Sequence, residues 1–362
     1  MRSIAIIPDS EPDALGAVSR LLAEAHAAEA SDLHLQSSAQ GIEVHWRVDG
    51  VLHPRPGFDG PLAERVIGRI KYLARLRTFQ DTLPQDGRIC AADAGLPQDL
   101  RVSTYPTVNG EKVVLRLFRG GAATPLPELG LPLPTLLAIQ QALAQPTGLI
   151  LLTGPAGSGK STTAHSALQD LARGGGRHIV SIEDPVEIIV PGIMQTEVNE
   201  ARGLTFAQAV RHLLRQDPQV LHIGEIRDEE TASLAVRAAL TGHLILSTLH
   251  AGSCRGVLER LRLLVPDAFA VAASLRLILN QRLIRRRCQA CAGTGCSVCT
   301  GTGYRGRVPL VEHLAITDDL RPALRQGDLE PFQPEITLAH AAAAAVQSGL
   351  THPAEIQRIL GS

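Results

Sequence analysis

The sequence predicts an α/β fold with a mostly parallel sheet, preceded by a smaller α+β unit. Two observations carry this expectation. Residues 135–362 alternate short apolar runs with helical patterns, which favours a parallel sheet covered on both faces. Residues 120–134, GGAATPLPELGLPLP, are too rich in glycine and proline for a regular element, so we expect an interdomain linker there and an N-terminal domain over 1–119.

The N-terminal unit carries signals for both helices and strands. Residues 13–30 and 62–77 have apolar side chains at helical spacing. Residues 42–48 alternate apolar and polar side chains up to Asp49-Gly50, a strong hairpin turn. Residues 113–118 predict a strand that closes the unit. The mixture indicates an α+β domain.

The larger unit carries four short apolar runs that we expect to be strands of one sheet. They are residues 149–153, 179–182, 220–223 and 244–247. Residues 162–172 favour a helix after the first of these runs, and the alanine-rich residues 336–360 predict helical structure at the end of the chain.

A glycine-rich loop, GPAGSGKS, joins the first expected strand to this helix. Glycines allow backbone amides to surround phosphates, Lys160 can reach the terminal phosphates, and the Ser161 hydroxyl can hold Mg²⁺. A chance glycine-rich turn is the alternative, but strand, loop and helix occur in the required order. The motif predicts a P-loop NTPase (RecA-like) domain that binds ATP with Mg²⁺. The expected nucleotide-binding residues are Gly154, Pro155, Ala156, Gly157, Ser158, Gly159, Lys160, Ser161 and Thr162.

Acidic residues follow two of the other strands at the sheet edge where ligands bind. The segment SIEDPVE supplies Glu183, Asp184 and Glu187, and VLHIGEIRD supplies Glu225 in the place of a Walker B acid. Phosphoryl transfer needs a metal ion and a positioned water, for which carboxylates are natural partners. An acidic turn, and a surface ion pair between Arg227 and Asp228, remain the structural alternatives.

Two histidines flank the last expected strand in TGHLILSTLH. A histidine can donate a hydrogen bond to the γ-phosphate. His250 follows the strand at the catalytic edge, whereas His243 precedes it. A purely structural role is the alternative for both, and it is the stronger alternative for His243.

Four of the six cysteines form two CxxC pairs in CQACAGTGCSVC, at Cys288, Cys291, Cys296 and Cys299. Four thiolates at this spacing suit tetrahedral zinc, and a site with four protein ligands is structural. Free buried thiols and CxxC redox chemistry are the alternatives.

The composition argues against two classes of protein. A net charge of -1 and an aromatic content of 3% do not favour a nucleic-acid binder. No apolar stretch approaches the ~20 residues that span a bilayer, and the start has no signal-peptide pattern. We therefore expect a cytoplasmic chain without a nucleic-acid partner.

The motifs together resemble the secretion ATPase superfamily, in the branch that assembles type II secretion pseudopili and type IV pili. The resemblance runs from about residue 30 to the end and rests on GPAGSGKST, SIEDPVE, residues 204–250 and GYRGRVPLVEHL. It implies that Glu187 activates water, that Glu225 is the Walker B acid and that Thr241, His243 and His250 sense the γ-phosphate. Glu183 and Asp184 are further catalytic candidates.

The N-terminal unit resembles the second N-terminal domain of that family through ASDLHLQ, RVDGVLH, QDGRI and residues 101–116. The resemblance places Arg88 and Arg101 at arginine-finger positions, where a guanidinium stabilises charge on the transferred phosphoryl group. Two surface arginines beside carboxylates are the alternative reading.

The resemblance further implies a homohexamer that hydrolyses ATP between its two domains and drives an inner-membrane platform protein, with the ring peripherally associated with that membrane. We expect no counterpart of the extra N-terminal docking domain of full-length assembly ATPases, and the loop between the CxxC pairs is shorter than usual. A retraction motor of the same superfamily, a nucleic-acid translocase and a nucleotide-binding scaffold without turnover are the rival functions.

Overall fold

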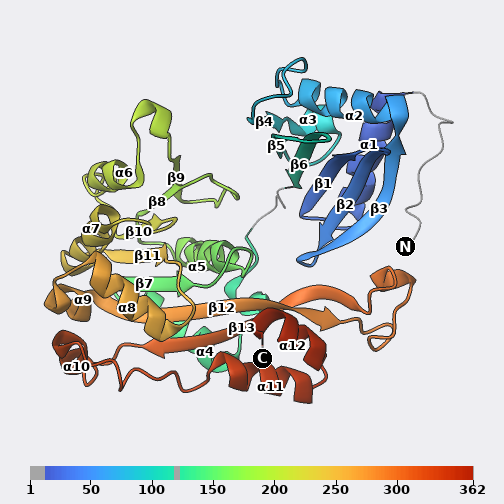
Figure 1. Ribbon diagram of the computed structural model, residues 1–362. Coiled ribbons are helices and arrows are strands. Elements are labelled where there is room, and N and C mark those ends of the chain that lie inside the picture. Colours follow the sequence, from blue (N-terminus) through green and yellow to red (C-terminus); the bar gives the residue numbers. More distant parts are fainter. Residues whose placement is uncertain (1–12, 118–122, 362) are drawn as a thin grey trace. The chain divides into compact units, whose positions relative to one another are not determined.

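The computed structural model describes residues 13–117 and 123–361, which form two compact units divided between Gly121 and Ala122 (Figure 1). Phe118, the expected end of a strand, and residues 120–122 of the expected linker lie outside the described residues. Among the helices of the described residues, none combines the length and apolar character that crossing a membrane requires.

The N-terminal unit is an antiparallel sheet packed against helices. Its described residues form six strands in the order β3-β2-β1-β6-β5-β4. The helices are α1 (Ala14–Ala27), α2 (Gly60–Leu73) and α3 (Ala91–Ala94). The strands are β1 (Asp32–Ser38), β2 (Gly41–Val48), β3 (Val51–Asp59), β4 (Gln85–Ile89), β5 (Leu100–Thr107) and β6 (Gly110–Leu117).

The alternation seen in the sequence decides which face of this sheet is buried. Ile42, Val44 and Trp46 on β2 are buried, and their intervening neighbours are partly exposed. They join the apolar side of α1 and α2 in one core. The expected helix 62–77 ends earlier, at Leu73, because Ala74 caps it and Arg75 adopts a positive φ of 59°.

The C-terminal unit contains a seven-stranded sheet within the described residues, in the order β13-β12-β7-β11-β10-β8-β9. The strands are β7 (Gly148–Thr153), β8 (Ile179–Glu183), β9 (Met194–Glu197), β10 (Val220–Ile223), β11 (Leu244–Thr248), β12 (Leu275–Arg287) and β13 (Tyr304–Ala315). All neighbours pair in parallel except β12 and β13, which form an antiparallel hairpin. This arrangement confirms the expected fold class.

Helices cover both faces of the parallel sheet. The α-helices are α4 (Leu133–Ala144), α5 (Lys160–Gly174), α6 (Phe206–Leu213), α7 (Glu229–Leu240), α8 (Cys254–Leu264), α9 (Ala268–Ser274), α10 (Arg321–Gln326), α11 (Leu338–Gln347) and α12 (Pro353–Leu360). Short 3₁₀ turns occur at Leu126–Leu129, Glu200–Arg202 and Ser297–Cys299.

Successive residues of β7 point to opposite faces, as the two-residue period of a strand requires. Leu149 and Leu151 pack in a core with α6 to α9, whereas Ile150 and Leu152 pack in a second core with α4 and α5. All four of these side chains are buried. Because helices cover both faces of this strand, each of its residues faces a core, and a continuous apolar sequence results.

Two expectations differ from the structure. Residues 120–134 are not a free linker throughout, because Leu126 is fully buried against α5 side chains and the second unit begins at Ala122. Residues 336–360 form two helices, since a turn with Gly349 at φ 72° separates α11 from α12. Composition alone did not show that Leu126 is buried, and it did not show that a glycine turn divides the C-terminal helical region.

Candidate functional site

The phosphate loop lies between the carboxyl end of β7 and the start of α5. Lys160 is the first residue of α5 and Gly159, with φ 89°, precedes it as the cap. Backbone amides at such a helix start point toward an anion. The Lys160 ammonium donates to the carbonyl oxygens of Gly154 at 2.8 Å and Pro155 at 3.0 Å, and burial lowers its pKa.

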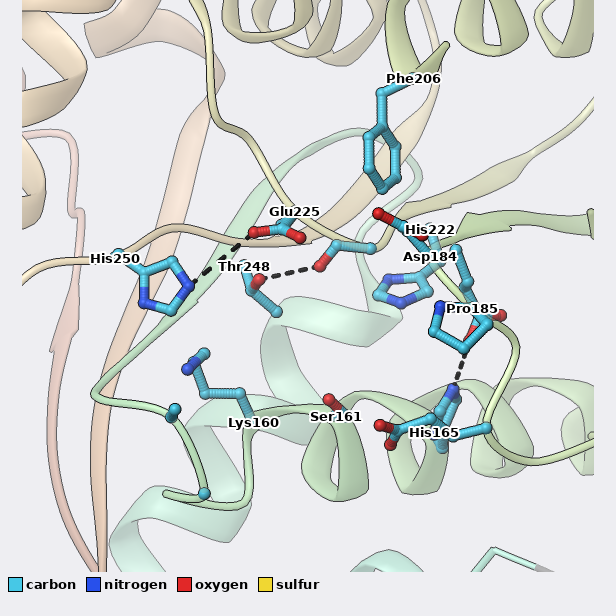
Figure 2. Close-up of a pocket in the computed structure, with 15 residues that line it drawn as sticks. Lys160, Ser161, His165, Asp184, Pro185, Phe206, His222, Glu225, Thr248 and His250 are labelled. Carbon is cyan, nitrogen blue, oxygen red and sulfur yellow. Dashed lines mark hydrogen bonds and ion pairs between the residues drawn. The ribbon is translucent and has the colours of Figure 1, made fainter. Parts of the chain in front are cut away.

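A cavity of about 200 Å³ opens beside this loop. The loop contributes Ala156, Gly157, Lys160 and Ser161 to its wall, while Gly154, Pro155, Ser158, Gly159 and Thr162 shape the loop without lining the cavity. Figure 2 shows Lys160 and Ser161 on one side, facing Glu225 and His250. The remaining lining residues are His165, Glu183, Asp184, Pro185, Glu187, Phe206, His222, Gly224 and Thr248.

The acidic candidates converge because β8 and β10 are neighbouring parallel strands whose carboxyl ends meet at one edge. Glu183 ends β8, and Asp184 and Glu187 follow it in the next loop. Glu225 follows β10. All four predicted carboxylates line the same cavity, so the structure provides the oxygen ligands that Mg²⁺ prefers in proteins.

Arg227 connects two of these acidic segments. Its guanidinium is ion-paired with Glu225 and lies 3.4 Å from Asp184 Oδ2, and the hydrogen bond to Glu225 raises its pKa. Asp228 has a different role, because its side chain accepts a hydrogen bond from the Thr231 amide at 2.7 Å and caps α7. The surface ion pair between Arg227 and Asp228, which was the structural alternative, is not formed: Arg227 pairs with Glu225 and Asp184, and Asp228 caps a helix.

The two candidate histidines lie at opposite ends of β11. His250 lines the cavity, with Nε2 3.8 Å from Glu225 Oε2. His243 precedes the strand, and its Nδ1 lies 3.1 Å from the Ala238 carbonyl oxygen. The Thr241 hydroxyl bonds the Arg237 carbonyl at 3.0 Å. The structure brings His250 to the cavity of this unit and does not bring His243 or Thr241 there.

Several lining residues were not singled out in the sequence. His165 and His222 meet Glu183 at the cavity floor, and Thr248 donates to the Gly224 carbonyl at 2.8 Å, which joins the ends of β11 and β10. Phe206 begins α6. His222 and Thr248 lie near the carboxyl ends of β10 and β11, inside motifs that the sequence shows. His165 lies on α5, and only the packing of that helix brings it to the cavity.

Glu183 is held as an anion in this floor. Burial would raise its pKa, but hydrogen bonds from His165, Ser181 and Gln195 lower it to about 2. Burial lowers the pKa of His222 to about 4, so its imidazole is neutral at pH 7. Glu183 is therefore a fixed negative charge at the cavity floor.

Arg88 and Arg101 lie directly opposite each other on β4 and β5 of the N-terminal unit. Arg88 pairs with Asp99 at 2.6 Å, yet 68% of its side chain is exposed. Like charges directly opposite on a sheet repel. Two exposed guanidinium groups on one face are thus suited to bind an anion.

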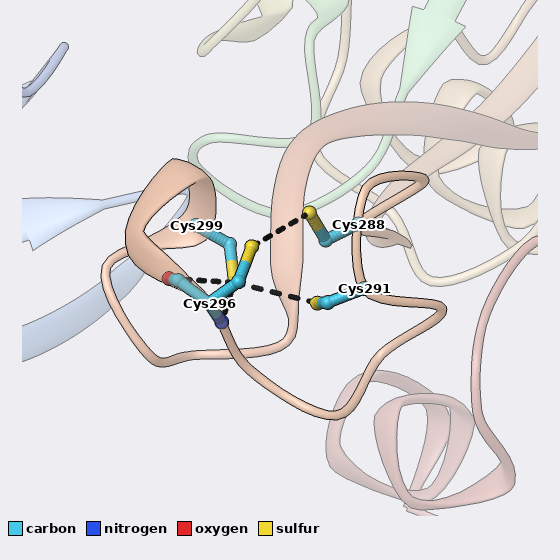
Figure 3. A group of neighbouring side chains, drawn as sticks. All are labelled: Cys288, Cys291, Cys296 and Cys299. Atoms are coloured by element: carbon cyan, nitrogen blue, oxygen red, sulfur yellow. Dashed lines mark hydrogen bonds between the residues drawn. The ribbon is translucent and has the colours of Figure 1, made fainter.

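The four cysteines form a compact cluster at the end of the β12–β13 hairpin (Figure 3). Neighbouring sulfur atoms lie 3.8 to 3.9 Å apart. A zinc–sulfur bond of 2.3 Å gives a tetrahedron with edges of about 3.8 Å. Backbone amides of Gly295, Cys296 and Gly303 donate to the Cys291 and Cys299 sulfurs. The donor set and its spacing fit a tetrahedral thiophilic ion.

Known proteins of one family are similar to this chain over most of its length. The family model described as "Type II/IV secretion system protein" matches residues 13–358. The type II secretion system protein E of Klebsiella pneumoniae is 39% identical over 384 residues, covering 97% of this chain and 77% of the relative. The type IV pilus assembly ATPase PilB of Thermus thermophilus is 38% identical over 338 residues, covering 86% of this chain and 38% of the relative.

A solved structure is similar along nearly the whole chain. The pilus retraction motor PilT with bound ADP superposes with a TM-score of 0.67 and 25% identity, covering 93% of this chain and 95% of that one. The chain therefore shares its fold with a motor protein that was solved with bound ADP.

Proposed function

The chain belongs to the type II/IV secretion system protein family, and on this premise we propose that it is an ATPase motor which drives assembly of a type II secretion pseudopilus or a type IV pilus. The observation that carries the proposal is that Lys160, Ser161 and the four carboxylates line one cavity. Positioning and electrostatic stabilisation supply most of the catalysis in phosphoryl transfer, and this cavity has the groups for both.

The proposed chemistry assigns one task to each group. Lys160 and the loop amides hold the β- and γ-phosphates, and Ser161 with Glu225 holds Mg²⁺. When bound, Mg²⁺ neutralises the charge that develops on the phosphates. Glu187 accepts the proton of the attacking water, and His250 donates a hydrogen bond to the γ-phosphate. Glu183 and Asp184 help to fix the carboxyl ends of the strands: Glu183 accepts a hydrogen bond from Ser181, and Asp184 pairs with Arg227.

The motor requires further partners, which we propose from the relatives. It assembles as a homohexamer in which Arg88 and Arg101 act as arginine fingers and His243 contacts a phosphate or a neighbouring copy. It binds the cytoplasmic side of an inner-membrane platform protein, without nucleic acid. The tetracysteine cluster holds a structural Zn²⁺, since the sulfur spacing fits and all four positions are filled by the protein.

The test is phosphate release by purified chain with Mg²⁺ and ATP. Lys160→Ala should abolish nucleotide binding and hydrolysis together, whereas Glu187→Gln should retain nucleotide and lower the rate by about 10² to 10⁴. Glu259→Gln is the matched control, because Glu259 is an exposed glutamate on α8 outside the cavity. Full turnover in Lys160→Ala would rule out this site, and nucleotide binding without turnover in the wild type would favour a scaffold.

The retraction motor is the alternative that the similarity to PilT supports. The relatives named for secretion and pilus assembly match at 39% and 38% identity, against 25% for the retraction motor. Deleting the gene distinguishes the two functions. Loss of filaments or of secreted protein supports assembly, while longer or more numerous filaments would support retraction.

A further inference from the structure

Three buried side chains from three different elements meet at the floor of the cavity. His165 lies on α5, Glu183 ends β8 and His222 lies on β10, and they are 2%, 4% and 3% exposed. One potential ligand atom of each lies within 4.8 Å of the other two. Figure 2 shows both histidines at the cavity, near Ser161. The proposed hydrolytic mechanism uses neither imidazole.

The surroundings orient all three groups. His222 Nδ1 lies 3.1 Å from the Leu246 carbonyl oxygen, which can only accept, so Nδ1 carries the proton and Nε2 keeps a lone pair. Glu183 Oε1 accepts hydrogen bonds from Ser181 at 2.7 Å and Gln195 at 3.0 Å. Such bonds to a carbonyl and to a carboxylate are the outer contacts that orient metal ligands.

The remaining carboxylate oxygen faces the second histidine. His165 Nε2 lies 2.7 Å from Glu183 Oε2. Bond lengths of 2.0 to 2.2 Å around zinc place neighbouring donor atoms about 3.3 to 3.5 Å apart. The separation between His165 and Glu183 is shorter than that value, and all three donor atoms lie within 4.8 Å of one another, so side-chain rotations can form a three-ligand site. The His165 ring proton then resides on Nδ1.

The donor set selects the kind of ion. Two imidazoles and one carboxylate suit divalent zinc, cobalt or nickel, whereas Mg²⁺ prefers oxygen ligands and retains several waters. We propose that His165, Glu183 and His222 bind a divalent transition-metal ion of the zinc class at the cavity floor. This site is separate from the tetracysteine cluster and from the Mg²⁺ that accompanies ATP.

An ion at this position would join α5, β8 and β10 directly below the phosphate loop. It would also place positive charge beside the bound phosphates. The three side chains alone form the site, so counting bound metal without nucleotide tests it independently of ATP hydrolysis.

The experiment adds one equivalent of Zn²⁺ to the metal-free full chain, which the four thiolates of the cysteine cluster bind first, and then titrates Co²⁺. Cobalt bound by nitrogen and oxygen absorbs in the visible range without the thiolate-to-cobalt charge-transfer band that a cysteine site produces. We expect one Co²⁺ per wild-type chain with that spectrum while the cysteine-held Zn²⁺ remains. His222→Leu should weaken this binding by more than about 100-fold, since loss of outer contacts alone costs 10- to 100-fold.

Glu183→Gln provides a second variant of nearly equal size should His222→Leu fail to fold, and circular dichroism reports folding of both. His340→Gln is the control, because His340 is an exposed histidine on α11. Uptake of Co²⁺ only with the thiolate band, absence of uptake, or equal uptake by wild type and the folded variants would each overturn the proposal.

Discussion

Lys71 Nζ lies 2.7 Å from Glu111 Oε2 inside the N-terminal unit, and their side chains are 1% and 7% exposed. Lys71 also donates to the Gln80 carbonyl at 2.7 Å, so the pair joins α2, β6 and the loop after α2. Removing one partner of a buried ion pair leaves an unpaired charge and typically costs 3 to 5 kcal/mol.

Lys71→Ala should therefore destabilise the N-terminal unit by about 3 to 5 kcal/mol. Trp46 is the one tryptophan of the chain and is buried in this unit, so its fluorescence during urea unfolding reports on this unit specifically. Lys112→Ala is the control, with an expected change of roughly 0.5 kcal/mol. If both changes lower the free energy of unfolding equally, the ion pair between Lys71 and Glu111 does not stabilise the unit.

Gly154→Ala should disrupt the phosphate loop more than Gly157→Ala. A Cβ at Gly154 would lie 2.3 Å from the Gln281 carbonyl oxygen, whereas a Cβ at Gly157 meets no atom within 4 Å. Both glycines have positive φ, so Gly157→Ala isolates the conformational cost, about 1 to 2 kcal/mol. Titration with a fluorescent ATP analogue measures the difference, expected to exceed tenfold in affinity. Equal affinities would argue against the close approach of β12 to the loop.

Arg88→Ala should lower hydrolysis by about 10³-fold if the guanidinium acts as an arginine finger. Affinity for ATP should change little, because a finger acts mainly on the transition state. Steady-state kinetics and nucleotide binding separate these effects. Arg65→Ala, on exposed α2 surface of the same unit, should leave both unchanged. If the variant loses affinity for ATP as much as it loses turnover, Arg88 binds ATP itself and does not act mainly on the transition state.

Cys291→Ser with Cys296→Ser should reduce the zinc content from about one ion per chain to nearly none, because two thiolates cannot hold a closed tetrahedral site. The end of the β12–β13 hairpin should then exchange amide hydrogens faster, since the sulfurs accept hydrogen bonds from Gly295 and Gly303. Elemental analysis and hydrogen exchange measure these changes. Cys90→Ser, outside the cluster, should retain the zinc. Unchanged zinc in the double variant would exclude the cluster as its ligand.

Glu355 should make the stability of the C-terminal unit depend on pH. Burial raises the pKa of this carboxyl, but hydrogen bonds from Arg358 and Arg285 lower it to about 2. Because the folded pKa lies below the unfolded value of about 4.3, the stabilisation is complete above that value and disappears as pH falls toward 2. Its size is on the order of 3 kcal/mol.

Calorimetry of wild type and Glu355→Gln between pH 2 and 6 measures this dependence. The difference in melting temperature should be largest near pH 6 and shrink toward pH 2. Glu330→Gln, at an 80% exposed side chain, should show no such trend. A difference that stays constant across this range would show that Glu355 stabilises by packing and not by charge.

The sequence by itself determined the features encoded within a few consecutive residues. The strands that precede the phosphate loop and the acidic segments were predicted nearly to their observed bounds, since both faces of each are buried and each run is mostly apolar. The loop and the CxxC pairs were visible because their chemistry requires fixed spacing. The helix capped by Asp228 and the long strands β12 and β13 were not anticipated. Several arginines interrupt the apolar pattern of β12, and its pairing with β7 depends on residues more than 100 positions away.

The tertiary structure decided which residues meet. It put His250 Nε2 3.8 Å from Glu225 Oε2, because the neighbouring parallel strands β11 and β10 present their carboxyl ends at one edge. It buried Leu126 within a segment that composition alone assigned to a linker. It also brought His165, Glu183 and His222 together, since only the packing of α5 on β8 and β10 determines which side chains face one another across the cavity floor.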